Sequence, residues 1–231
     1  MKIKIINVVK SYEGREVLNI PDLEIKNGLI YAIIGLNGSG KSTLLQCIAG
    51  IEKLSGGRIE YKENLNYEDC KLDISYMNQK PYLFDETVKK NILMGLKYRK
   101  LSKTEIDNRF EKYRYYFDME YLLDKNSKKL SGGEYAKTAL LRTAVLEGNL
   151  ILLDEVTASM DIESTIKAEK LIKDMKKEEN TIILVTHDLY QARRIADYVI
   201  FMDQGKIIEK GLKEDVFNNP QHALVKNMLT I

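Results

Sequence analysis

The sequence has few of the features that mark secreted or membrane-spanning chains. It holds two cysteines, Cys47 and Cys70, which are too few for a scaffold stapled by disulfides. Its first residues lack the apolar stretch of a signal peptide, so we expect a reducing, cytoplasmic compartment. The longest apolar runs, such as 30–34 and 198–202, fall far short of the roughly 20 residues that cross a bilayer. We therefore expect a chain that does not itself span a membrane.

A strong charge of either sign is also absent. The 36 basic residues nearly cancel the 34 acidic ones, so the field of the whole chain indicates neither a nucleic acid nor an acidic partner. Basic stretches at 97–103 and 125–129 lie near acidic residues and are typical of solvated helix faces. We expect no nucleic-acid partner. At 231 residues the chain is long enough for one large α/β domain, or for a core domain with a smaller lobe.

Two kinds of strand pattern are present. The segments 2–9 and 17–25 are rich in β-branched residues and partly alternate, as in half-exposed antiparallel strands. Other runs are short and continuously apolar, which is typical of strands buried on both faces of a mainly parallel sheet. These runs are 29–34, 150–153, 181–185 and 198–202.

Helical stretches lie between these strands, at 41–49, 102–117, 134–147 and 162–177. The alternation predicts an α/β fold. From about residue 86 to residue 147, strand signals thin out and helix formers dominate. We therefore expect one domain over 1–231, with a core at 1–85 and 148–231 and an inserted helical subdomain at 86–147.

A phosphate-binding loop is the strongest motif. Residues 35–42 read GLNGSGKS, the P-loop pattern, and they follow a buried strand and precede a helix. The glycines let backbone N–H groups curve around phosphates, Lys41 reaches the β and γ oxygens, and the Ser42 hydroxyl can bind Mg²⁺. An ordinary glycine-rich turn is the competing interpretation, and the context makes it much less favoured. The nucleotide-binding residues expected here are Gly35, Asn37, Gly38, Ser39, Gly40, Lys41, Ser42 and Thr43.

An apolar strand that ends in two carboxylates is the second motif. Residues 150–153 lead directly into Asp154 and Glu155. Parallel sheets place such strand ends beside the phosphate-binding loop. Asp154 would hold Mg²⁺, directly or through water, and Glu155 would polarise the water that attacks the γ-phosphate. Alone, the pair could simply open a solvated loop, but the P-loop upstream makes the catalytic interpretation the stronger one.

The third motif, LSGGE at 130–134, precedes a helical stretch. Ser131 is suited to be an N-cap, and Gly132 and Gly133 make a flexible approach to the helix. Taken alone, the motif predicts only a helix start. In a chain that already has a P-loop, a second glycine-rich helix N-terminus is also a second anion site.

In their order along the chain, these motifs resemble the ATP-binding cassette family over essentially the whole sequence. The resemblance rests on the P-loop, Gln79, the LSGGE signature, the acidic strand end, the segment Ala158-Ser159-Met160-Asp161 and His187. It implies a P-loop NTPase fold with an N-terminal antiparallel β subdomain. It also implies a Mg²⁺-dependent ATPase that works as a head-to-tail homodimer, with ATP between the P-loop of one chain and the signature of the other. Ser131, Gly132 and Gly133 would then bind the γ-phosphate of the partner's ATP.

The resemblance also implies roles for single residues. Gln79 would approach Mg²⁺ and the attacking water, and His187 would contact the γ-phosphate as a switch, so both join Glu155 as catalytic candidates. Asp161 would run along the dimer interface. Tyr12 resembles the aromatic residue that stacks on adenine. The alternatives stay open, because a tyrosine can pack its own turn and a histidine at a strand end is often structural.

The sequence departs from the family pattern in three places. The signature ends in Glu134 instead of the commoner Gln, and Tyr135-Ala136-Lys137 replaces the usual Gln-Arg start of the following helix. Val156 stands where the family usually has proline after the catalytic Glu. These positions flank the chemistry, so we expect them to affect interface strength and rate more than the type of reaction.

The resemblance implies the ATP-hydrolysing subunit of a membrane transporter of the importer type, bound peripherally to the inner face of the membrane. Its partners would be a transmembrane permease and an extracytoplasmic solute-binding protein. The region 79–97 is most similar to the tungstate or molybdate branch, and phosphate and polar amino-acid importers stay open. Within it we expect Tyr82, Leu83 and Phe84 to form an exposed docking loop for the permease. The alternative is that these side chains plug the base of the helical lobe.

Other P-loop classes fit less well. A GTPase would need a base-reading Asn-Lys-x-Asp segment, which is missing from the sequence. A chromosome-structure ATPase would need a long coiled coil, and only 51 residues separate Gln79 from the signature serine. The remaining alternative is a soluble ATPase of the same family that acts on nucleic acid or the ribosome.

Overall fold

The computed structural model describes residues 1–62 and 65–230, and the chain forms two compact units. The first unit comprises Met1–Ile74, Asn149–Asp154 and Lys176–Ile231. The second comprises Ser75–Gly148 and Glu155–Met175. One of the points at which the chain passes between the units therefore lies between Asp154 and Glu155, the two carboxylates at the acidic strand end.

The first unit begins with an antiparallel sheet of β1 (Ile3–Tyr12), β2 (Arg15–Ile25) and β4 (Gly56–Tyr61), in the order β2-β1-β4. Ile3 and Ile5 are buried and Lys4 between them is exposed, because successive side chains of a strand point to opposite faces. The β1–β2 hairpin pairs Ile3 with Ile25 and Tyr12 with Arg15. The hairpin therefore has one face in the core and ends at Tyr12.

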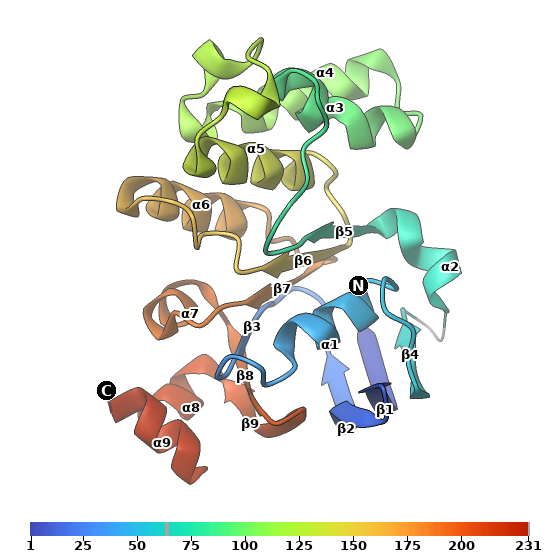
Figure 1. Ribbon diagram of the computed structural model, residues 1–231, viewed down its shortest axis with the longest axis vertical. Coiled ribbons are helices and arrows are strands. Elements are labelled where there is room, and N and C mark those ends of the chain that lie inside the picture. Colours follow the sequence, from blue (N-terminus) through green and yellow to red (C-terminus); the bar gives the residue numbers. More distant parts are fainter. Residues whose placement is uncertain (63–64, 231) are drawn as a thin grey trace. The chain divides into compact units, whose positions relative to one another are not determined.

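A mainly parallel sheet forms the core of the first unit (Figure 1). Its strands β6, β7, β3, β8 and β9 are neighbours in this order, and only β9 runs antiparallel to its neighbour. Their bounds are β3 (Ile30–Ile34), β6 (Leu150–Asp154), β7 (Thr181–Val185), β8 (Tyr198–Asp203) and β9 (Lys206–Leu212). Every residue of β3, β6 and β7 is buried, as the continuously apolar sequence of such strands requires.

Helices cover this sheet within the first unit. They are α1 (Lys41–Ile48), α7 (Leu189–Ile195), α8 (Lys213–Asn218) and α9 (Ala223–Thr230), whereas α2 (Tyr67–Cys70) packs beside β4 of the antiparallel sheet. Ala32 and Phe201 of the sheet form an apolar cluster with Ala192, Val216 and Val225 of the last three helices. The helices α7, α8 and α9 are thus anchored on β8 and on β3, the strand that leads into the P-loop.

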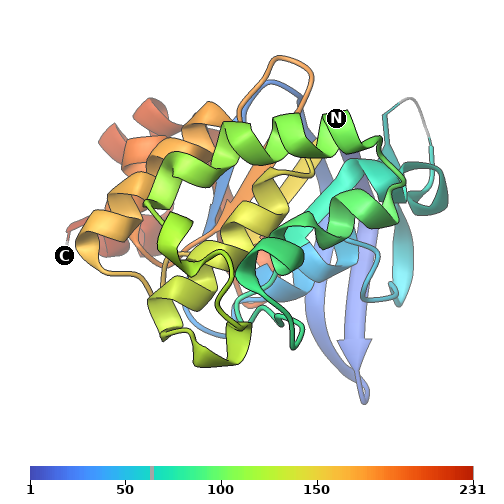
Figure 2. The same cartoon turned by 90° about the horizontal axis from the view of Figure 1, so that it is seen from above.

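The second unit is helical apart from β5 (Ile74–Met77) at its start. Its helices are α3 (Val88–Tyr98), α4 (Lys103–Tyr113), α5 (Gly132–Ala144) and α6 (Ile162–Asp174), with short 3₁₀ turns at 114–117, 120–122 and 127–129. Figure 2 shows α3, α4 and α5 of this unit, in green to yellow-green, with α3 beside both α4 and α5. The helical lobe expected at 86–147 lies inside this unit.

The α/β expectation is confirmed, together with the antiparallel N-terminal strands and the mainly parallel sheet. The strands β4, β5 and β9 were not expected, because they are short or only half buried and lack a continuous apolar run. Among the residues that the structure describes, no helix combines the length and the apolar character needed to span a bilayer.

Candidate functional site

The P-loop joins the buried strand β3 to helix α1. A Cβ on Gly35 would collide with the carbonyl oxygen of Met202, so only glycine fits there. Gly40 has φ 97°, and a Cβ on it would lie 2.8 Å from Leu18 Cδ2 and 3.0 Å from the carbonyl oxygen of Val17. The sequence therefore folds into this loop because two glycines allow the backbone to pass close to β2 and β8.

The start of α1 is suited to bind an anion. Gly40 is its N-cap and has no side chain, so no side-chain oxygen caps the first backbone N–H groups. Such N–H groups and the helix dipole together attract phosphate oxygens. The hydroxyl of Ser39 is buried and has no hydrogen-bond partner among the described residues, which marks a polar atom suited to a ligand.

The side chain of Lys41 is buried against the loop itself. Its ammonium donates to the carbonyl oxygens of Gly35 and Leu36, both at 2.9 Å. The positive charge is therefore held over the curve of the loop, where phosphate oxygens would lie. Asn37 and Gly38 are exposed at the crest of the loop, and Thr43 is half-buried in the first turn of α1.

An oxygen-rich pair lies beside this helix start. The Ser42 hydroxyl donates to Asp154 Oδ1 at 3.1 Å, and Asp154 is buried at the end of β6. A hydroxyl and a carboxylate are the donors that Mg²⁺ prefers, and this ion usually takes few protein ligands and completes its shell with phosphates and water. Ser42 and Asp154 therefore fit Mg²⁺.

The loop that carries His187 is tied to the P-loop strand. The N–H of Thr186 donates to the carbonyl oxygen of Ile33, the penultimate residue of β3, at 3.2 Å. The hydroxyl of Thr186 accepts from Asp188 N–H at 3.0 Å, and Asp188 caps α7. These bonds fix the turn in which His187 is exposed.

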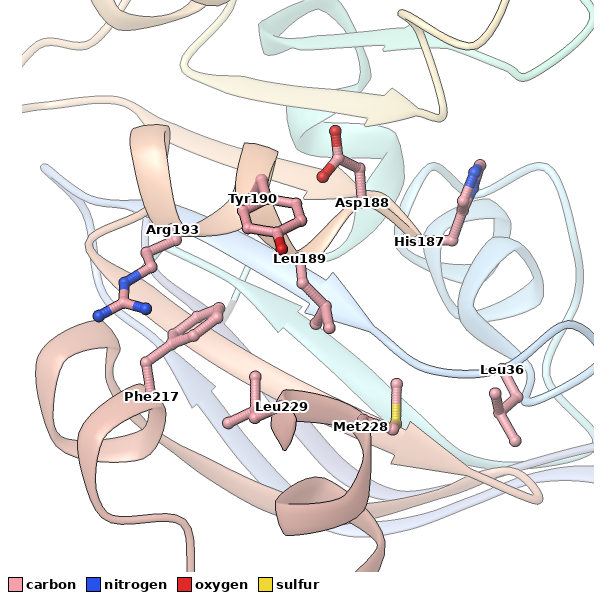
Figure 3. Close-up of a pocket in the computed structure, with 9 residues that line it drawn as sticks. All are labelled: Leu36, His187, Asp188, Leu189, Tyr190, Arg193, Phe217, Met228 and Leu229. Atoms are coloured by element: carbon pink, nitrogen blue, oxygen red, sulfur yellow. The ribbon is translucent and has the colours of Figure 1, made fainter. Parts of the chain in front are cut away.

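A hollow of about 470 Å³ lies next to His187 and the P-loop residue Leu36 (Figure 3). Leu189, Tyr190 and Phe217 line it with Met228 and Leu229 of α9. Figure 3 shows Arg193 and Phe217 at one end of this hollow and His187 at the other. A mainly apolar lining of this kind does not suit a triphosphate, so the phosphate site is the loop and not this hollow.

Tyr12 lies at the tip of the β1–β2 hairpin and is exposed. The ammonium of Lys10 lies 4.4 Å from the centre of its ring and pairs with Glu52 at 2.7 Å. Arg15, which pairs with Tyr12 in the hairpin, lines a cavity of about 430 Å³ together with Gly38 of the P-loop. The hairpin end and the P-loop therefore share one opening. Lys10 and Glu52 belong to no motif, so their place beside Tyr12 could not be predicted from the sequence.

Within the second unit, Gln79 and Glu155 are in direct contact. The Gln79 side-chain amide donates to Glu155 Oε2 at 2.8 Å. Glu155 has φ 47°, a left-handed conformation that costs a residue with a Cβ about 1 to 2 kcal/mol. The structure thus brings together two residues that lie 76 positions apart in the sequence and holds one of them in a strained backbone.

The signature segment starts α5. Ser131 is the N-cap, its hydroxyl accepts from Glu134 N–H at 3.4 Å, and Glu134 accepts from Ser131 N–H at 2.8 Å. The backbone N–H groups of Gly132 and Gly133 at this helix start suit a phosphate oxygen. Asp161 caps α6 by accepting from Ser164 N–H at 2.7 Å, and this bond lowers the pKa of its carboxyl group.

The expected docking loop is only partly exposed. Tyr82 and Phe84 are exposed, but Leu83 is buried. The inclusion of Leu83 in an exposed patch was therefore wrong, because Tyr135 holds its backbone N–H and its side chain is packed in the interior between two exposed neighbours. Val156, which replaces the usual proline, is also buried.

Comparison with known proteins places these observations in a family. The model of the ABC transporter family matches residues 18–158. Over 210 residues the chain is 39% identical to the ATP-binding protein of a tungstate uptake system from Peptoclostridium acidaminophilum, covering 90% of this chain and 98% of that protein. It is 34% identical to a phosphate import ATP-binding protein of Pyrobaculum aerophilum, covering 95% of this chain and 94% of that one.

Solved structures of ABC transporter ATPases are also similar to this chain. A component of an ABC transporter complex from Clostridium perfringens superposes with a TM-score of 0.81 at 32% identity, covering 94% of this chain and 90% of that chain. A dimeric ATP-binding cassette in a post-hydrolysis state, with ADP and phosphate bound, superposes with a TM-score of 0.81 at 26% identity, covering 91% and 98%.

Proposed function

This chain belongs to the ABC transporter family, and from that premise we propose that it drives an importer by hydrolysing ATP. ATP binding and hydrolysis are the activity of the family, so the chain is an ATPase. The observation that carries the proposal is the presence, in one chain, of the P-loop cradle and of a second glycine-rich helix start at Ser131. A P-loop enzyme that binds its nucleotide within a single chain does not need this second anion-binding helix start.

In the proposed mechanism the residues of the first unit hold the nucleotide. The N–H groups at the start of α1 and the Lys41 ammonium bind the β- and γ-phosphates, and Tyr12 stacks on the adenine. Ser42 and Asp154 would hold Mg²⁺, which supplies charge neutralisation on the phosphate oxygens when it is bound. Gly35, Asn37, Gly38, Ser39, Gly40 and Thr43 complete the cradle.

The second unit supplies the groups for water activation. Glu155 accepts a hydrogen bond from the attacking water and polarises it, and the Gln79 amide positions both the carboxylate and the water. Their hydrogen bond at 2.8 Å supports this pairing. His187 contacts the γ-phosphate. Its neighbour Thr186 is hydrogen-bonded to Ile33 of β3, so this contact is linked to the strand that leads into the P-loop. As a functional division of the chain, we propose a nucleotide-binding core at 1–85 and 148–231, which includes Gln79, Glu155 and His187. The helical subdomain at 86–147 then carries the signature.

We propose a head-to-tail homodimer as the working state. Ser131, Gly132 and Gly133 of one chain bind the γ-phosphate of the ATP held by the partner's P-loop, and Asp161 lies along the interface. The glycine-rich start of α5 and the dipole of this helix suit an anionic group. The similar structure that holds ADP and phosphate is dimeric, which supports this arrangement.

The chain acts from the cytoplasmic face of the membrane on a transmembrane permease, with an extracytoplasmic solute-binding protein in the same system. Similarity to the ATP-binding proteins of tungstate and phosphate systems favours an oxyanion as the transported solute. Tyr82 and Phe84 are the aromatic side chains that we assign to the permease contact.

Phosphate release tests the enzymatic mechanism. The purified chain should release phosphate from ATP with Mg²⁺ and lose this activity with EDTA. Glu155→Gln should bind labelled ATP with unchanged affinity and turn it over at least 100-fold more slowly, because general-base positioning contributes about 10² to 10⁴ in rate. A Glu155→Gln enzyme with more than a tenth of the wild-type rate would contradict the role of Glu155.

Uptake separates the transporter from the alternative, a soluble ATPase that acts on nucleic acid or the ribosome. Cells that express the chain with its permease should accumulate labelled tungstate or molybdate, and Glu155→Gln should stop this. Wild-type ATPase activity stimulated by RNA, with no dependence of uptake on the chain, would favour the alternative.

A further inference from the structure

The segment from Tyr82 to Phe84 presents two aromatic rings on a buried base. The side chains of Tyr82 and Phe84 are 69% and 45% exposed, whereas Leu83 between them is 5% exposed. The two rings meet edge to face with their centres 5.4 Å apart. The outward side chains therefore form one rigid aromatic pair.

Helix α3 holds this segment from below through a buried amide. Asn91 is fully buried, and its side chain accepts from Phe84 N–H at 2.8 Å and donates to the Phe84 carbonyl oxygen at 3.0 Å. The hydroxyl of Ser127 donates to the same carbonyl oxygen at 2.6 Å. Both backbone groups of Phe84 are thus fixed by side chains from elsewhere in the second unit.

Helix α5, which begins with the signature, holds the same segment from its other side. The N–H of Leu83 donates to the phenolic oxygen of Tyr135 at 2.5 Å. The guanidinium of Arg142 donates to the Tyr82 carbonyl oxygen at 2.7 Å. Tyr135 and Arg142 lie seven residues apart, which places them on one face of the helix.

Tyr135 is also joined directly to the signature. It belongs to the first turn of α5, and its N–H donates to the carbonyl oxygen of Ser131 at 2.9 Å. A displacement of Leu83 therefore acts on the turn that presents Ser131 and Gly132. This connection passes through the side chain of Tyr135, one of the positions where the sequence departs from the usual Gln-Arg helix start.

We propose that Tyr135 is a positioning residue that transmits permease contact at Tyr82 and Phe84 to the signature, with Arg142 as the second tie. This inference rests on the proposed function, since it assumes that the aromatic pair meets the permease. Tyr135 does not touch ATP or the attacking water. Its phenolic oxygen makes the docking segment and the first turn of α5 move as one body.

Hydrogen exchange tests the structural link. In the full isolated chain, Tyr135→Phe keeps the ring and removes the acceptor, so the Leu83 amide should exchange about five-fold faster, the effect of one ordinary hydrogen bond. The Phe84 amide, held by Asn91, should be unchanged. Tyr121→Phe, which removes an exposed hydroxyl in the same unit, is the matched control. An unchanged Leu83 amide in Tyr135→Phe would overturn the link.

Stimulation of the ATPase by the permease tests whether Tyr135 transmits the permease contact to the signature. In the isolated chain Tyr135→Phe should hydrolyse ATP within two-fold of the wild type, and it should still co-purify with the permease. In the assembled transporter, the ratio of permease-stimulated to basal rate should fall at least three-fold, and Arg142→Lys should lower it in the same direction. A stimulation ratio equal to the wild type for both variants would overturn the proposal.

Failure of the proposed function would look different. Phe84→Ser should abolish co-purification with the permease, which Tyr135→Phe leaves intact. If the wild-type chain itself shows no stimulation by the permease, the assigned function fails. If the wild type is stimulated and Tyr135→Phe is stimulated equally, the function stands and only the role of Tyr135 is lost.

Discussion

At the residue scale, the site depends on groups held against their local preferences. Glu155 occupies a left-handed conformation, and the Ser39 hydroxyl is buried without a hydrogen-bond partner among the described residues. Each of these features has a free-energy cost of about 1 to 3 kcal/mol in the folded chain. Such costs are typical of positions that a ligand or a reaction has shaped.

Lys41 should dominate the affinity for nucleotide. Lys41→Ala removes a charge-assisted contact to the phosphates, worth about 1.5 to 3 kcal/mol, so the dissociation constant for ATP should rise at least ten-fold. Equilibrium dialysis with labelled ATP measures this, and Lys53→Ala, away from the loop, is the matched control. Binding by Lys41→Ala within a few-fold of the wild type would contradict the phosphate site.

Most of the individual site residues could be predicted from the sequence, since the P-loop, the acidic strand end and the signature are contiguous motifs. The exposure of single side chains could not. Leu83 reads as part of an apolar patch, and only the direction of its side chain shows that it belongs to the core. The hydrogen bonds of Asn91 and Arg142 to the segment 82–84 could not be predicted either, because they depend on how the helices pack.

At the scale of elements, the helix α5 combines a functional start with a strong cap. Glu134 accepts from Ser131 N–H, and this bond, together with the Ser131 hydroxyl and the cation of Lys125 at 3.5 Å, lowers the pKa of its carboxyl group. A carboxylate in the first turn of a helix also interacts favourably with the helix dipole. The Glu in place of the usual Gln therefore stabilises the signature turn.

This stabilisation should depend on pH. Because the pKa of Glu134 is lower in the folded chain, its contribution is fully present above the ordinary value of 4.5 and is lost as the pH falls through the folded value. Glu134→Gln should lower the free energy of unfolding by about 0.3 to 1 kcal/mol at neutral pH. Urea unfolding at about pH 7 and about pH 3.5 measures the difference, which should be smaller at the lower pH. An equal loss at both pH values would show that charge is not the cause.

Long and periodic elements could be predicted from the sequence, and short ones could not. The all-buried strands β3, β6 and β7 and the helix α6 are found close to their expected bounds. The short helices α2, α7, α8 and α9 were missed, since four to eight residues carry too little periodicity, and the longer α3 was expected only as part of the helical lobe. Their existence depends on caps and tertiary contacts, such as Asp188 at the start of α7.

At the scale of the whole molecule, the motifs are divided between the two units. The P-loop, Asp154 and His187 belong to the first, and Gln79, Glu155 and the signature belong to the second. The family resemblance predicted the function from the sequence of these motifs. The division itself had no signal in the sequence, because Asp154 and Glu155 are neighbours in the chain and in one motif.

The central claim is that each ATP is held by the P-loop of one chain and the signature of its partner. Mixing two inactive variants tests it most directly, with phosphate release as the measurement. Lys41→Ala removes the P-loop charge, and Ser131→Arg blocks the signature. In a head-to-tail heterodimer both defects fall in one site and the other site is intact.

Each variant alone should be nearly inactive. The mixture should recover about a quarter of the wild-type rate, since half of randomly formed dimers carry one intact site of two. If the P-loop and the signature of the same chain formed the site, no intact site would arise. A mixture as inactive as its two components, with heterodimers present by size and mass, would contradict the account.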